Sequence, residues 1–118
     1  MTKEIEFGQY LRQQREAKSA KEFSLRRVAG RVGIEPSYLS KIERGEQPPP
    51  GEDTIRRIAE ELGEDSDILL ALAGKVSTDL LEVIRARPAL IAELLRAVRT
   101  APAKHVTQAV RKVRDGDW

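Results

Sequence analysis

The sequence predicts an all-α fold, because apolar residues recur at helical spacing and because capping residues, glycines and prolines mark the ends of short segments. The segment from Ser24 to Gly45 shows both features most clearly. It predicts two short helices joined by a tight turn, in which Gly33 ends the first helix and Pro36 begins the second. The apolar residues that we assign to the core in this segment are Val28, Val32, Leu39 and Ile42.

Charge is distributed unevenly along the 118 residues, although the net charge is only +2. Residues 24–45 carry five basic and two acidic side chains, whereas residues 46–70 carry two basic and eight acidic ones. A basic surface on an otherwise balanced protein favours nucleic-acid binding, although surface charges can also cluster by chance. We expect the split in charge to orient the protein on a polyanion.

Several protein classes are not expected from this composition. Without cysteine, the chain has no disulfide framework and no cysteine-based zinc site. No apolar run approaches a bilayer span and the N-terminus lacks the apolar region of a signal peptide, so a cytoplasmic protein is expected. An enzyme is not expected either, because the single histidine, His105, has no nearby carboxylate motif. We expect no cofactor and no metal ion.

The pattern Ser-x-x-x-x-Ala-x-x-x-Gly-Ile-x-x-Ser-Tyr-Leu-Ser-Lys-Ile-Glu-Arg-Gly, which begins at Ser24, resembles the Xre-type helix-turn-helix proteins, the class of the lambdoid phage repressors. Its last part, Ser37 to Gly45, is the most specific. The resemblance covers roughly Phe7 to Gly74 and implies a five-helix lambda-repressor-like DNA-binding domain, which we place at residues 5–74. Residues 75–118 are then a short helical C-terminal extension.

A first helix is predicted from about Ile5 to Lys18, on the helical spacing of Phe7, Tyr10, Leu11 and Gln14. Gly8 is unfavourable inside a helix by roughly 1 kcal/mol relative to alanine. The resemblance implies that a small residue there lets neighbouring elements approach closely.

The stretch between the first two helices departs from the family pattern, because Ala17–Phe23 is longer and lacks glycine. Two arrangements are open at this point. The first helix extends by a turn, or the loop bulges and Phe23 packs back as a staple against the second helix.

Two further helices complete the predicted domain. The proline-rich stretch 46–51 cannot be helical and forms a stiff connector. The fourth helix starts at Glu52 or Asp53 and stops at Gly63, and the fifth opens at residues 65–67 and closes at Gly74. The buried stripe that we expect on the fourth helix is Ile55, Ile58, Ala59 and Leu62.

The extension predicts three more helices, Asp79–Arg87 capped by Ser77, Ala89–Arg99, and a last one that begins at Pro102. Each is too apolar on one face to stand alone, so these helices pack on the first five or meet their copies in another chain. We favour self-association as a homodimer. The residues that we expect at its core are Leu90, Ile91, Leu94, Leu95 and Val98.

The resemblance implies that the second helix of the motif enters the major groove of double-stranded DNA. By family position the base-reading residues are Pro36, Ser37 and Lys41. Lys41 can donate to guanine O6 and N7, the Ser37 hydroxyl discriminates weakly, and Pro36 offers only apolar contact. Because this direct readout is sparse, we expect DNA shape and deformability to contribute.

Contacts to phosphates set the register of such a domain on DNA. The N-terminus of the second helix, at Ser24 and Leu25, presents backbone N–H groups to a phosphate. Arg26, Tyr38 and Arg44 can reach the DNA backbone. For Arg27 and Arg31, a solvated face is at least as good an interpretation.

The resemblance also implies an ion pair between Arg15 and Glu43 that fixes the first helix against the third. The alternative is a solvated surface arginine. If the pair is buried, removing one partner costs about 3–5 kcal/mol.

Three functional hypotheses follow. The first is a sequence-specific, repressor-like transcriptional regulator that binds an inverted repeat as a homodimer, with half-sites about 34 Å apart. The second is an antitoxin that represses its own operon and binds a toxin through the extension. The third is a protein-interaction module that uses the same helices without DNA.

Overall fold

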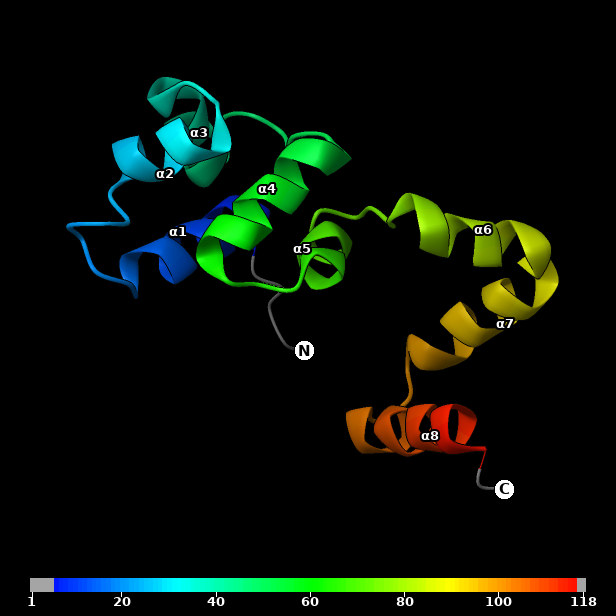
Figure 1. The fold of residues 1–118 in the computed structure, drawn as a ribbon. Helices are drawn as coiled ribbons and strands as arrows, with labels where there is room; N and C mark the ends of the chain where they lie inside the picture. Colours follow the sequence, from blue (N-terminus) through cyan, green and yellow to red (C-terminus); the bar gives the residue numbers. More distant parts are fainter. Residues whose placement is uncertain (1–5, 117–118) are drawn as a thin grey trace. The chain divides into compact units, whose positions relative to one another are not determined.

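The computed structural model describes residues 6–116, and their regular structure is entirely helical (Figure 1). This confirms the all-α prediction. The described residues fall into two compact units that divide between Ser77 and Thr78. The first unit contains α1 (Phe7–Glu16), α2 (Leu25–Val32), α3 (Pro36–Glu43), α4 (Glu52–Leu62) and α5 (Ser66–Leu72). The second contains α6 (Thr78–Ala86), α7 (Pro88–Val98) and α8 (Ala103–Asp115).

The predicted start of the first helix at Ile5 lies outside the described residues. At its other end α1 stops at Glu16, before the predicted Lys18. No helix among residues 6–116 has both the length and the apolar composition that crossing a membrane requires.

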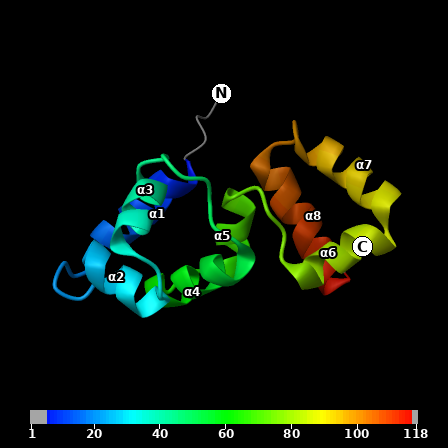
Figure 2. The same cartoon turned by 90° about the horizontal axis from the view of Figure 1, so that it is seen from above.

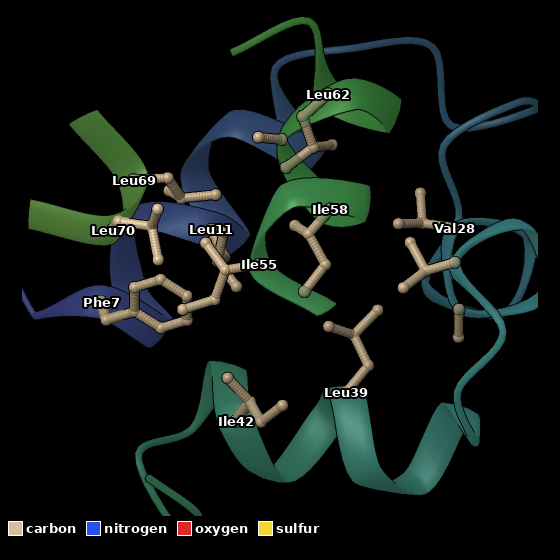
Figure 3. Packing of buried hydrophobic residues seen from close by; sticks show 13 residues of the cluster. Phe7, Leu11, Val28, Leu39, Ile42, Ile55, Ile58, Leu62, Leu69 and Leu70 are labelled. Carbon is tan, nitrogen blue, oxygen red and sulfur yellow. The ribbon is translucent and has the colours of Figure 1, made fainter. Parts of the chain in front are cut away.

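The first unit is held together by apolar side chains that all five of its helices contribute to one core (Figure 3). Ile55 and Ile58 of α4 lie in the middle of this core, between α1 and the α2–α3 pair. Leu39 and Ile42 point into it from α3. The residues predicted for the inner faces of α2, α3 and α4 are all buried. Burying a leucine or isoleucine side chain contributes about 1.5–3 kcal/mol to the free energy of unfolding. The core therefore fixes the positions of α2 and α3 relative to the other helices.

A glycine permits the close approach of α1 to α3. A Cβ atom at Gly8 would overlap the carbonyl oxygen of Ile42 and lie 3.0 Å from the carbonyl carbon and oxygen of Glu43. The backbone of α1 therefore rests directly on the last turn of α3. The expectation that a small residue at this position serves close packing is confirmed.

The loop between α1 and α2 takes the second of the two predicted arrangements. Its residues form no extension of α1, and Phe23 packs against the core from a partly buried position. Two cations lie near the Phe23 ring, with Lys18 Nζ 5.8 Å and Arg31 Cζ 5.1 Å from its centroid. The staple therefore links the loop to α2, which carries Arg31.

The helices of the second unit follow their predicted order with shifted ends. The φ of Arg87 is −136° and its ψ is 58°, so α6 ends at Ala86. A residue before proline disfavours the helical region, whereas Pro88 itself suits the first position of α7. The predicted cap at Ser77 is wrong, because its buried hydroxyl makes no hydrogen bond.

Apolar side chains of the second unit stay in contact with solvent. No described residue of α6, α7 or α8 is buried. A groove of about 480 Å³ lies between α7 and α8. Figure 2 shows the ribbons of these two consecutive helices. The groove is lined by apolar residues such as Leu94, Val98, Val106, Val110 and Val113.

Candidate nucleic-acid interface

The N-terminus of α2 keeps backbone donors available for an anion. The Ser24 hydroxyl accepts a hydrogen bond from the backbone N–H of Arg27 at 3.2 Å and caps the helix, as predicted. The N–H groups of Leu25 and Arg26 lie in the first turn, where a helix offers them no acceptor. Together with the positive end of the helix dipole, they can bind a phosphate oxygen. The side chain of Arg26 is exposed beside them.

The turn that joins α2 to α3 is tight because Gly33 adopts a left-handed conformation with a φ of 89°. The N–H groups of Gly33 and Ile34 both donate to the carbonyl oxygen of Ala29, at 2.9 and 3.0 Å. Pro36 then begins α3 with a φ that suits a helix. This geometry leaves little freedom between the two helices, so the core that holds α2 also orients α3.

The helix α3 presents opposite faces to the core and to solvent. Leu39 and Ile42 are each 1% exposed, whereas Ser37 and Lys41 are exposed. Pro36 and Tyr38 lie between these extremes, and the Tyr38 ring packs against the edge of the core. Ser37 and Lys41 are four residues apart, so they lie on the same side of the helix. Both side chains therefore face solvent on the side of α3 opposite to the core.

A buried ion pair fixes the position of α3 relative to α1. Arg15 Nε and Nη2 donate to the two carboxylate oxygens of Glu43 at 2.8 and 2.9 Å. Arg15 Nη1 donates to the carbonyl oxygen of Phe23 at 3.2 Å, which also fixes the loop before α2. The Arg15 and Glu43 side chains are only 12% and 4% exposed. The hydrogen bonds to Glu43 raise the pKa of Arg15, so the guanidinium stays charged. The alternative of a solvated Arg15 is wrong.

A protein-family model described as a helix-turn-helix domain matches residues 6–72, more than half of the chain. The chain belongs to the helix-turn-helix domain family. The match confirms the resemblance that rests on the segment from Ser24 to Gly45. It spans all of α1 to α5, so the helix-turn-helix domain coincides with the helices that build the first core. No curated protein and no solved structure matches the chain.

The arginines of the helix-turn-helix differ in whether they form ion pairs or hydrogen bonds with other residues of the protein. Arg44 Nε lies 3.0 Å from a carboxylate oxygen of Glu46 and 3.3 Å from the carbonyl oxygen of Ser40, while the Arg44 side chain is 51% exposed. Arg31 Nε donates to a carboxylate oxygen of Glu61 on α4 at 2.5 Å. Arg31 is therefore a structural link between α2 and α4. Arg27 is exposed, next to Arg26 in the sequence.

Two side-chain pairs that join residues 30 or more positions apart in the helix-turn-helix domain were not predicted. The Tyr10 hydroxyl donates to Glu64 at 3.4 Å, and burial together with this carboxylate raises the pKa of Tyr10. The Arg31–Glu61 pair was also missed. Both contacts join residues that lie 30 or more positions apart, and neither has a local spacing signal.

Proposed function

We propose that this protein is a sequence-specific, repressor-like transcriptional regulator that binds an inverted-repeat operator as a homodimer. The proposed DNA-binding domain has the five-helix lambda-repressor-like arrangement and covers residues 5–74. The observation that carries the proposal is the exposure of Ser37 and Lys41 on α3. The opposite face of this helix is buried in the core through Leu39 and Ile42. A helix held in this way can enter the major groove without changing the fold around it.

Lys41 is the main base-reading residue in this proposal. Its ammonium group can donate to guanine O6 and N7, and the discrimination from a good base contact is about 1–3 kcal/mol. Ser37 and Pro36 add a weak polar contact and an apolar contact one turn earlier on α3. Ser24, Leu25, Arg26, Tyr38 and Arg44 contact phosphates and thereby set the register.

Homodimerisation through the helical extension, residues 75–118, is the second part of the proposal. Leu80, Val83, Leu90, Leu94, Leu95, Val98, Val110 and Val113 are between 37% and 68% exposed. Fully burying one such side chain contributes about 1.5–3 kcal/mol, so covering the exposed half of eight contributes about 6–12 kcal/mol. A homodimer covers these side chains on both chains, which doubles the gain to about 12–24 kcal/mol, against an association cost of about 4–15 kcal/mol. Two domains held by a two-fold axis then reach two half-sites about 34 Å apart.

Selection of bound fragments from random duplexes at about 0.15 M salt tests the DNA-binding part. The wild-type protein is expected to enrich a palindromic site. Lys41→Ala is expected to lower the preference for that site over random DNA by about 5- to 150-fold, the equivalent of one lost base contact. Lys104→Ala on α8 removes the same charge outside the domain and serves as the control. Equal binding of selected and random duplexes by the wild-type protein would refute the proposal.

A further inference from the structure

The only acidic residues between Ser24 and Gly45 are Glu35 and Glu43. Glu43 is buried and pairs with Arg15, so its carboxylate is not available to a ligand. Glu35 is exposed and precedes Pro36, the first residue of α3. It is therefore the carboxylate of this segment that lies next to the proposed DNA-binding residues.

The backbone of Glu35 is held by hydrogen bonds of α3, whereas its side chain makes no capping hydrogen bond. Its carbonyl oxygen accepts hydrogen bonds from the N–H groups of Tyr38 and Leu39, at 3.0 and 3.1 Å. Its carboxylate makes no capping hydrogen bond, although Glu35 occupies the N-cap position of α3. The Glu35 side chain therefore extends from a backbone position that is fixed at the N-terminus of α3. In the proposed complex this end of α3 enters the major groove of DNA first.

A carboxylate at this place is costly on DNA unless it finds a donor, because phosphates surround the groove and repel it. An ionised carboxylate can only accept hydrogen bonds. In the major groove, guanine presents acceptors, thymine presents an acceptor and a methyl group, and adenine pairs its donor with an adjacent acceptor. Cytosine N4 is the donor that a carboxylate can meet without a neighbouring acceptor on the same base.

We propose that Glu35 is a specificity-determining residue that selects a cytosine in each half-site through its N4 amino group. This inference rests on the proposed function, because it needs α3 to lie in the major groove. Glu35 and Lys41 then read the groove with opposite chemistry, one accepting from cytosine and the other donating to guanine. Repulsion between Glu35 and phosphates lowers the affinity for every site that lacks this cytosine, so the residue acts by rejection as well as by attraction.

The test is fragment selection with the full chain as wild type, Glu35→Gln and Glu35→Ala. The wild-type half-site is expected to contain a cytosine that is preferred by about 5- to 150-fold over the other bases. Glu35→Gln is expected to change that base to adenine, since an amide can bind adenine N6 and N7 together. Glu35→Ala is expected to lose the preference at this position and to bind random duplexes more tightly.

Glu60→Gln is the matched control, because it removes one exposed carboxylate from α4 and is expected to keep the cytosine. Thermal unfolding of each variant separates a change in readout from a loss of fold. If wild type selects a site but Glu35→Gln and Glu35→Ala select the same bases as wild type, the role of Glu35 is refuted while the proposed function stands. If wild type selects no site, the proposed function itself fails.

Discussion

Gly8 lies where the backbone of α1 meets the last turn of α3. Since a Cβ atom there would overlap the Ile42 carbonyl oxygen, Gly8→Ala must push the two helices apart. We expect a loss of about 1–3 kcal/mol in the free energy of unfolding, the range for overpacked sites. Gly30→Ala is the control, because nothing lies within 4 Å of a Cβ at that position of α2. It is expected to gain about 0.5–1 kcal/mol. Urea denaturation measures both, and equal effects would contradict the close approach.

Arg15 and Glu43 offer a second test at the level of single residues. Replacing either one with alanine leaves a buried charge without its partner, and we expect a loss of about 3–5 kcal/mol in the free energy of unfolding. The double replacement is expected to cost less than the sum. Arg12 and Glu16 form a comparison pair at 3.4 Å that is more than half exposed, and we expect it to contribute about 0.3–0.5 kcal/mol. Denaturation of the two double-mutant cycles measures this contrast, and additive losses at Arg15 and Glu43 would exclude a coupled pair.

Helix ends were predictable where a local signal marks them. Ser24, Gly33 and Pro36 set the bounds of α2 and the start of α3 through hydrogen bonds and φ values that depend on near neighbours. Such local signals did not determine the conformation of the loop before α2. Its course depends on the packing of Phe23 and on the hydrogen bond from Arg15 to its carbonyl oxygen, both of which need the folded core.

In the candidate site, too, features set by neighbouring residues could be predicted and features set by distant residues could not. The helical period alone separates the inner Leu39 and Ile42 from the outer Ser37 and Lys41, so the faces of α3 could be predicted. The engagement of Arg31 by Glu61 could not, because it joins α2 to a helix that begins after the proline-rich connector. The sequence therefore predicted which residues of α3 face solvent. It did not predict which arginines pair with carboxylates elsewhere in the chain.

At the scale of the whole molecule, the two units differ in how they bury apolar surface. The first unit has a core to which all five of its helices contribute, whereas no described residue of α6, α7 or α8 is buried. Three short helices without a core are marginal in water, since most helical stability in proteins comes from packing. The proposed homodimer would supply that missing packing, and so would couple the folding of the second unit to association.

Leu94→Glu tests this coupling, because it places a charge in the apolar groove between α7 and α8. At micromolar concentration we expect wild type to sediment as a dimer and the variant as a monomer with less helix by circular dichroism. Binding to a single half-site is expected to stay the same, while binding to the complete inverted repeat weakens because the two domains are no longer linked. Gln108→Glu introduces the same charge on an exposed polar residue of α8 and is expected to remain dimeric. A monomeric wild type with full helix content would refute both the homodimer and the coupling of folding to association.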